Sequence, residues 1–164
     1  VLDPEVVGDD HSGVLSVYSL SKQSNLAGYR AALIGGDPAL VSRLLTVRKH
    51  AGLMLPAPVQ DAMSVALADD AHVAEQRERY RSRREILRPA LESAGYRIEG
   101  SEAGLYLWAT RDADAWESVA AFADLGIVVG PGHFYGDHSP QHVRLALTAS
   151  DADIAAAAAR LRGR

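Results

Sequence analysis

The chain has 164 residues, of which 48% are hydrophobic and 23% charged, as in an ordinary globular protein. A formal net charge of −4 gives no reason to expect nucleic acid or an anionic membrane as a partner. No uninterrupted apolar run could span a bilayer, nothing resembles a signal peptide, and the lack of cysteine excludes disulfides and thiolate chemistry. These features fit a cytoplasmic protein.

Two apolar runs near the start of the chain predict buried strands. Residues 14–18 read Val-Leu-Ser-Val-Tyr, and residues 31–34 read Ala-Ala-Leu-Ile, closed by two glycines. The loop between them contains Ser-Leu-Ser-Lys at 19–22 and Gly-Tyr-Arg at 28–30. A lysine in a loop between buried strands can lose its proton by desolvation and become a nucleophilic amine.

Lys22 has neighbours suited to an anion. The hydroxyls of Ser19 and Ser21 flank it, and the guanidinium of Arg30 follows; such groups hold phosphate. A Schiff-base lysine with a phosphate anchor is the chemical description of a pyridoxal 5′-phosphate site. Composition alone leaves open the alternative that Lys22 is a solvated lysine in a serine-containing loop.

Helical patterns come next. Asp37, followed by proline, predicts the start of a helix whose apolar face extends to about Lys49. A rigid, proline-containing connection at residues 54–58 precedes a second helical stripe that begins at Val59.

The most charged part of the chain is a helix predicted at residues 71–94. Between Glu75 and Arg88 it carries six arginines and three glutamates. A basic helix can bind nucleic acid or an acidic partner. Because the glutamates interleave with the arginines and an apolar stripe persists, we favour a solvated helix with one buried edge.

The last third of the chain predicts a small mixed α/β domain. Short strands are expected at residues 96–99, 105–109, 127–129 and 143–147. Helices are expected at residues 114–124 and from Ser150, where Asp153 stands at the spacing of a capping box.

Arg144 lies in the otherwise apolar run 143–147. Such an arginine is either a surface residue of an edge strand or a buried cation that awaits an anion. The residues alone leave both readings open, and the cost of burying a guanidinium favours the surface. The nearby His133, His138 and His142 fit no standard zinc spacing, so we predict no metal site.

The segment around Lys22 resembles the cofactor-lysine segment of class I/II aminotransferases, whose motif is Ser-x-Ser-Lys followed by Gly-x-Arg. Both parts are present, at 19–22 and 28–30, with the family's spacing. The resemblance implies that Lys22 forms the Schiff base with pyridoxal 5′-phosphate. It also implies that Ser19, Ser21 and Arg30 bind the cofactor phosphate.

Three further segments are similar to the same family. Residues 143–147 resemble the strand whose arginine clamps the substrate α-carboxylate, which implies that role for Arg144. Residues 103–108 resemble a Gly-Gly-aromatic-aromatic-Leu-Trp strand at the edge of the active site. Residues 130–136 resemble a Pro-Gly-x-x-Phe-Gly loop, here with Tyr135 between Phe134 and the last glycine.

The resemblance covers essentially the whole chain and implies the C-terminal portion of a fold type I pyridoxal phosphate-dependent transferase, an α/β fold. Residues 1–50 would end the large cofactor-binding domain, residues 51–70 would form an interdomain connector, and residues 71–164 would form the small domain. In the family the lysine falls past the middle of a chain more than twice this long. We therefore expect the residues that contact the pyridine ring to lie outside this sequence, and we expect a homodimer.

The resemblance implies an aminotransferase that moves an amino group between an amino acid and a keto acid. Residues 19–22, 28–30 and 48–60 are most similar to actinobacterial N-succinyldiaminopimelate aminotransferases of lysine biosynthesis, which use glutamate as donor. Three alternatives stay open. They are a carbon–sulfur β-lyase of the same fold, an aminotransferase-like effector domain of a transcription regulator, and an interaction module that has lost catalysis.

Overall fold

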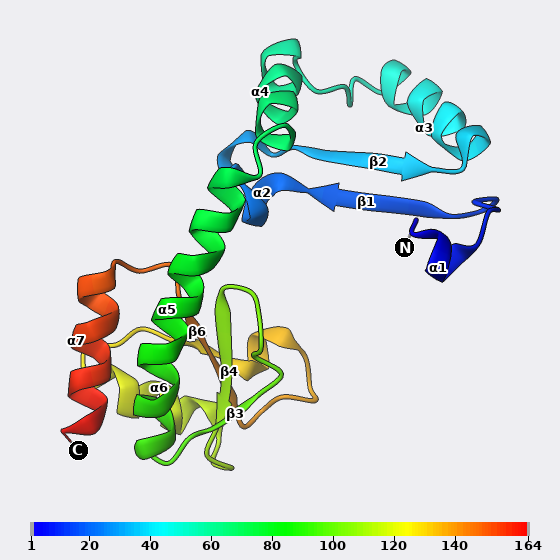
Figure 1. The fold of residues 1–164 in the computed structure, drawn as a ribbon. Coiled ribbons are helices and arrows are strands. Elements are labelled where there is room, and N and C mark those ends of the chain that lie inside the picture. The colour runs from blue at the N-terminus through cyan, green and yellow to red at the C-terminus, as the bar shows by residue number, and fades with distance from the viewer. Residues whose placement is uncertain (1, 164) are drawn as a thin grey trace. The chain divides into compact units, whose positions relative to one another are not determined.

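The computed structural model describes residues 2–163, which form a mixed α/β fold (Figure 1). The chain divides into two compact units, one up to Ala74 and one from Glu75 onward. Each unit is described by itself. Among the described residues no helix combines the length and the apolar character needed to cross a membrane.

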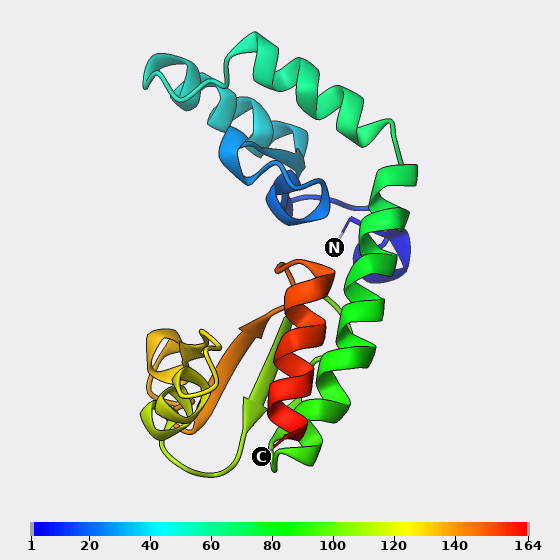
Figure 2. The same ribbon diagram turned by 90° about the vertical axis from the view of Figure 1, so that its left-hand side faces the viewer.

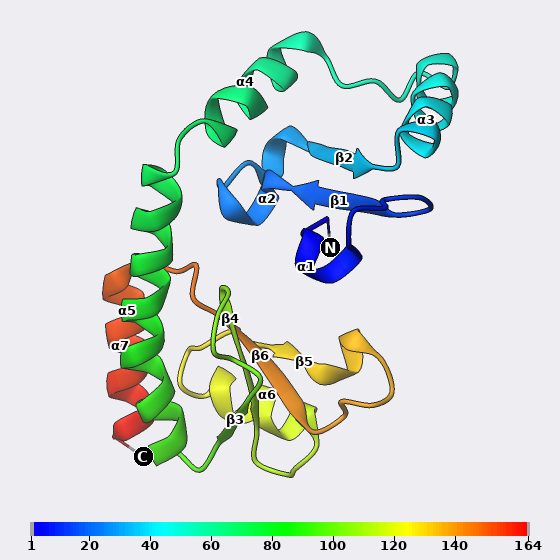
Figure 3. The same cartoon turned by 45° about the vertical axis from the view of Figure 1, so that its right-hand side comes forward.

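The first unit contains a two-stranded antiparallel sheet and five helical segments (Figure 3). In chain order its elements are α1 (Pro4–Val7), β1 (Leu15–Ser19), α2 (Leu20–Gln23), the 3₁₀ turn η1 (Ala27–Tyr29), β2 (Ala32–Gly36), α3 (Pro38–His50) and α4 (Ala57–Leu67).

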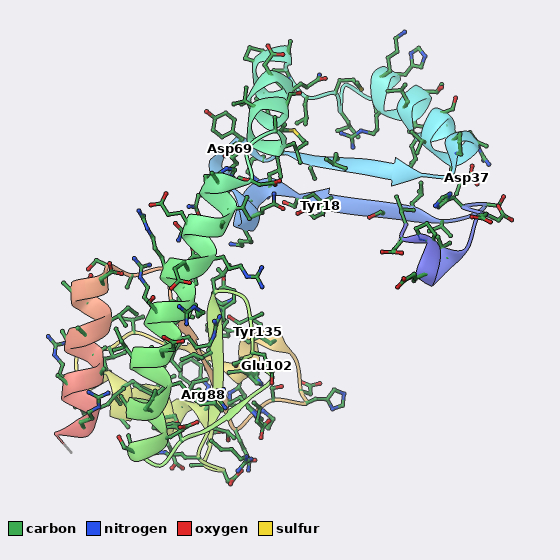
Figure 4. All side chains as sticks on the ribbon, viewed as in Figure 1. Tyr18, Asp37, Asp69, Arg88, Glu102 and Tyr135 are labelled. Carbon is green, nitrogen blue, oxygen red and sulfur yellow. The ribbon has the colours of Figure 1, made fainter. Side chains whose placement is uncertain are left out.

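The strands β1 and β2 lie where the sequence predicted them, shifted by one or two residues, but they are not buried. Their register pairs Val17 with Ile34 and Ser19 with Ala32. Val17 is 69% exposed and Tyr18, labelled on β1 in Figure 4, is 45% exposed. The prediction of buried strands is therefore wrong for the described residues, because a pair of strands with few helices against it leaves much of both faces open.

The core of the first unit is small. Its buried residues are Leu20, Ala31 and Met63, which come from α2, the segment before β2, and α4. The helix α3 begins as predicted, because the Asp37 carboxylate accepts hydrogen bonds from the amides of Ala39 and Leu40 at 2.7 and 3.3 Å.

The second unit contains a four-stranded sheet covered by helices. Its elements are α5 (Ala71–Ser93, which begins before the boundary), β3 (Arg97–Glu99), β4 (Tyr106–Thr110), α6 (Ala115–Ala123), β5 (Gly130–Pro131), the 3₁₀ turn η2 (Gly132–Tyr135), β6 (His142–Ala146) and α7 (Asp151–Arg162). Figure 2 shows α5 and α7 side by side against the sheet.

The strand order is β3-β4-β6-β5, and every pairing is antiparallel. One face of the sheet presents buried apolar side chains to a large core, while the opposite face carries aromatic and charged side chains. The buried residues of this core are Leu87, Ala90, Leu91, Tyr96, Leu107, Ala109, Ala115, Phe122, Val129, Val143, Leu145, Leu147, Ile154, Ala158 and Leu161.

Two predictions for this unit have different outcomes. The helix from Ser150 is confirmed, because the Ser150 hydroxyl accepts a hydrogen bond from the Asp153 amide and donates one to the Asp153 carboxylate. The strand predicted at 127–129 is wrong, because pairing with β6 begins only at Gly130 and Val128 is 97% exposed.

Candidate active site

Lys22 lies on α2, a single helical turn that directly follows β1. Ser19 caps this turn: its hydroxyl oxygen accepts a hydrogen bond from the Ser21 amide at 3.3 Å. The Ser19 hydroxyl also donates to the Ser21 hydroxyl at 3.0 Å. Leu20, which is fully buried, anchors the turn in the small core. The two hydroxyls and the lysine are therefore held on one short, anchored segment.

The loop predicted around Lys22 is in part a helix, and it does not bury the lysine. The side chain of Lys22 is exposed, so the desolvation expected between two buried strands is absent from the described part of the chain. The physical reason is that β1 and β2 themselves lack cover. Within residues 2–163 the Lys22 amine has no hydrogen-bond or ion-pair partner, which leaves it open to react.

Arg30 reaches the same end of the β1–β2 pair. Since Ser19 pairs with Ala32, the antiparallel register brings the residue two positions before Ala32 beside the start of α2. The turn η1 packs against α2, and the Arg30 guanidinium donates to the Ala27 carbonyl at 3.1 Å. The register thus gathers Ser19, Ser21, Lys22 and Arg30 at one end of the sheet.

The backbone here adopts an uncommon conformation at two positions. Asn25 and Arg30 both have left-handed φ angles, of 54° and 52°. Asparagine tolerates this region, whereas for an arginine it costs about 1 kcal/mol or more. Strain of this kind persists where the surrounding structure fixes a side chain in a required direction, which agrees with a functional position for Arg30.

These residues fit the phosphate end of pyridoxal phosphate. Two neighbouring hydroxyls and a permanent cation are the donors that a phosphate dianion requires, and the exposed amine of Lys22 is the group that an aldehyde requires. No carboxylate forms an ion pair with Lys22 or Arg30 in the described residues, so none competes for these two cations.

Arg144 lies on β6, between β4 and β5 in the sheet, on the face opposite the core. Its side chain is half-buried. The guanidinium carbon lies 4.2 Å from the centre of the Tyr106 ring and 5.0 Å from the centre of the Tyr135 ring. The structure therefore supports neither simple alternative from the sequence, because Arg144 is neither on an edge strand nor deeply buried.

The aromatic partners of Arg144 were not identified as site residues from the sequence. Tyr106 stands diagonal to Arg144 on the same face of the β4–β6 pair, a relation that strand alternation could have indicated. Tyr135 comes from η2, whose approach to β6 has no sequence signal of its own.

The histidines near this face have carboxylate partners. His142 lies 3.0 Å from a Glu99 carboxylate oxygen and stacks on Trp108, and His133 lies 3.4 Å from an Asp114 carboxylate oxygen. The hydrogen bond with His142, followed by that with Arg97, lowers the pKa of Glu99. No cluster of three or more potential metal ligands occurs among residues 2–163.

Ser19, Ser21, Lys22 and Arg30 lie in the first unit, and Arg144 lies in the second. The structure brings the first four together. It describes Arg144 separately, with its own aromatic partners.

The class of protein that this fold and these residues define is an aminotransferase: residues 4–161 match the family aminotransferase class I and II, and the chain belongs to it. This confirms the family resemblance drawn from the motifs around Lys22 and Arg144. Enzymes of this family use pyridoxal phosphate.

Two curated relatives are particularly similar. The chain is 62% identical over 161 residues to the 4-dedimethylamino-4-oxo-anhydrotetracycline transaminase OxyQ of Streptomyces rimosus, covering 98% of this chain and 45% of that protein. It is 58% identical over 161 residues to a probable aminotransferase of Mycobacterium tuberculosis, covering 98% and 38%. The chain therefore spans less than half the length of these relatives. They do not single out the N-succinyldiaminopimelate subgroup.

Solved structures agree on the fold. An aminotransferase from Neisseria meningitidis has a TM-score of 0.85 at 28% identity, and the match covers 98% of this chain and 42% of that one. An aspartate aminotransferase from Thermus thermophilus has a TM-score of 0.82 at 21% identity, covering 95% and 44%. The chain thus has part of the fold of fold type I aminotransferases, as the sequence predicted.

Proposed function

We propose that the whole protein is a pyridoxal phosphate-dependent aminotransferase that moves an amino group between an amino acid and a keto acid. The observation that carries the proposal is the gathering of two hydroxyls, an exposed amine and an arginine at one end of the β1–β2 pair. Membership of the aminotransferase family supports it. The proposed catalytic residue is Lys22, the proposed phosphate ligands are Ser19, Ser21 and Arg30, and the proposed carboxylate ligand is Arg144.

Each residue has a separate task. When bound, pyridoxal phosphate supplies an electron-withdrawing ring that stabilises negative charge at the substrate α-carbon. Lys22 Nζ removes the α-proton and later returns a proton, acting as general base and then general acid. Ser19, Ser21 and Arg30 hold the phosphate, and the planar fork of Arg144 orients the α-carboxylate.

We also propose the organisation of the whole protein. Residues 1–50 would form the C-terminal end of a large cofactor-binding domain, residues 51–70 would form an interdomain connector, and residues 71–164 would form a small domain. The exposed side chains of β1 and the half-buried ones of β2 support this, because they suit a strand pair that continues into a larger sheet. A cytoplasmic homodimer is part of the same proposal.

Two substrates deserve the first tests. The motif similarity at residues 19–22, 28–30 and 48–60 favours N-succinyldiaminopimelate, with glutamate as the donor, and LL-diaminopimelate aminotransferases are also among the relatives, at 34% identity for that of Oleidesulfovibrio alaskensis. The 62% identity to OxyQ favours instead a keto group on an anhydrotetracycline-type ring.

Lys22 can be tested directly, since this chain contains only two lysines, Lys22 and Lys49. Borohydride reduction of the full-length, cofactor-loaded protein should leave the cofactor on the peptide that contains Lys22. Lys22→Ala should lower kcat by several orders of magnitude, whereas Lys49→Ala, on the last turn of α3, should leave it within about twofold. A labelled peptide elsewhere, or an active Lys22→Ala variant, would refute the assignment.

The substrate can be ranked by half-reactions of the full-length protein with glutamate, N-succinyldiaminopimelate, LL-diaminopimelate and common amino acids, and by turnover with 4-dedimethylamino-4-oxo-anhydrotetracycline as the acceptor. Loss of the cofactor's absorbance identifies each donor. Product analysis separates the alternatives, because a transaminase yields a keto acid only while an acceptor turns over, whereas a carbon–sulfur β-lyase yields pyruvate and ammonia. If none of the donors lowers the cofactor's absorbance, that result would support the effector domain of a transcription regulator or the interaction module that has lost catalysis.

A further inference from the structure

We propose that Tyr135, assisted by Tyr106 and by the absence of a side chain at Gly130, is a positioning residue for Arg144. The inference rests on the proposed function, in which Arg144 binds the substrate α-carboxylate. Its basis is the placement of the guanidinium 4.2 Å from one tyrosine ring and 5.0 Å from the other. Among residues 2–163 no carboxylate or carbonyl oxygen accepts a hydrogen bond from the Arg144 guanidinium.

Aromatic rings can hold a guanidinium without occupying its donors. The ring face attracts the cation through its quadrupole, and the N–H groups at the rim of the guanidinium plane stay available. A carboxylate holder would occupy those N–H groups and neutralise the charge. The pair of tyrosines therefore orients Arg144 and keeps its donor fork open for a substrate.

Arg97 on the same sheet shows the contrasting arrangement. It donates two hydrogen bonds to the Asp112 carboxylate, at 2.9 and 3.0 Å, and one to Glu99 at 2.9 Å. The hydrogen bonds with Asp112 and Glu99 raise the pKa of Arg97. The donors of Arg97 are committed to protein carboxylates, so it has a structural role, whereas in the described part of the chain the Arg144 guanidinium is held by rings alone.

Several contacts keep the Tyr135 ring in place. It meets Trp108 edge to face, with ring centroids 5.5 Å apart, and Trp108 in turn stacks on His142 at 5.2 Å. Figure 4 labels Tyr135 beside β4, the strand that carries Trp108. A row of ring contacts thus begins at the Arg144 guanidinium and continues through Tyr135, Trp108 and His142, on the face of the sheet opposite the core.

Two glycines make room for this arrangement. Gly130 pairs with Arg144 in the sheet, and a Cβ there would lie 3.3 Å from the Tyr135 hydroxyl. At Gly132, which starts the turn η2, a Cβ would come within 1.9 Å of the Ser139 carbonyl oxygen. The turn can therefore close and deliver Tyr135 to Arg144 only with glycine at position 132.

The kinetic consequence follows from the shared chemistry of the substrates. An amino acid donor and a keto acid acceptor both carry the α-carboxylate that Arg144 binds, before and during the reaction, whereas a ring ketone does not. A displaced Arg144 would weaken binding of the ground state and of the transition state to the same extent. KM should therefore rise for both substrates while kcat stays close to its original value.

The test uses the full-length, cofactor-loaded protein. Tyr135→Leu should raise KM for donor and acceptor about tenfold, with kcat within about twofold, which corresponds to the upper range of a cation–π contact. Tyr135→Phe keeps the ring and should restore KM to within about twofold. Phe134→Leu is the matched control: this neighbour is 69% exposed and its ring contacts Trp116, so KM should not change.

The variant Arg144→Ala separates the two proposals. In that background Tyr135→Leu should have no further effect on KM. If Arg144→Ala raises KM and Tyr135→Leu does not, the positioning role is overturned and the carboxylate role stands. If Arg144→Ala leaves KM unchanged, the carboxylate role fails regardless of Tyr135. Tyr106→Leu provides the second variant should Tyr135→Leu fail to fold, and an unchanged KM there would also overturn the proposal.

Discussion

The two units differ sharply in how much core they possess. The second unit buries residues from α5, α6, α7 and the two strands β4 and β6 in one cluster, whereas the first unit, within the described residues, buries only Leu20, Ala31 and Met63. Since burial of apolar surface is the main source of stability, the unit that carries Lys22 has little stability of its own. The unit that carries Arg144 can support its own geometry.

Exposed apolar side chains show the same difference. Val17, Leu45, Val47 and Val65 of the first unit are each more than half exposed. A two-stranded sheet is marginal in water unless a further strand or helix covers it. We therefore expect the geometry around Lys22 to depend on cover from outside this unit; the relatives, of which this chain spans 45% and 38%, are long enough to supply it.

The largest expected effect comes from separating the units. A fragment of residues 71–164, which includes all of α5, should fold and unfold cooperatively in urea, as followed by circular dichroism. A fragment of residues 1–70 should show no cooperative transition, because its core is too small to offset the chain entropy of folding. A cooperative transition in residues 1–70 would contradict the comparison.

A core substitution sharpens the comparison within the intact chain. Phe122 is 1% exposed, and its ring lies 5.0 Å from that of Tyr96. Phe122→Ala should lower the free energy of unfolding of the second unit by about 3–5 kcal/mol. Phe134→Ala, at a ring that is 69% exposed, should change it by less than about 0.5 kcal/mol. Urea titration of residues 71–164 measures both, and equal effects would show that Phe122 is not a core residue.

Most helices and strands could be predicted from the sequence, but the elements that bury or pair with them could not. The helices from Asp37 and Ser150 could be predicted because their caps are local hydrogen bonds. The prediction of a strand at 127–129 was wrong, because an apolar run does not reveal whether its backbone finds a pairing partner. The prediction that β1 and β2 are buried was wrong for the described residues, because burial depends on the elements that surround a strand.

The candidate site divides in the same way. The segment from Ser19 to Arg30 could be identified because its motif residues lie close together in the sequence. Arg144 could be identified because it is a charged residue within an apolar run. The Tyr135–Arg144 contact could not be found, since it depends on the turn η2 closing over Gly132. Contacts made by irregular turns are set by tertiary structure, which local patterns do not encode.

The smallest expected effect is the response of each unit to acid. In the first unit, hydrogen bonds from the Gly13 amide, and next from the Ala39 amide, lower the pKa of Asp37. In the second unit, the hydrogen bond from Arg97 lowers the pKa of Asp112. A carboxylate whose pKa is lower in the folded state stabilises that state above its unfolded pKa of about 4, and this contribution disappears as the pH falls through the folded value.

Asp37→Asn keeps a side-chain oxygen at the start of α3 and removes the titration. Hydrogen exchange of the full-length protein between pH 5 and the onset of acid unfolding should show a weaker loss of protection in α3 for this variant than for the parent. Protection in β3 and β4 should fall equally in both proteins, because Asp112 is unchanged. If Asp37→Asn altered the acid response of β3 and β4 as much as that of α3, the two units would not respond independently, and the division between them would have to be abandoned.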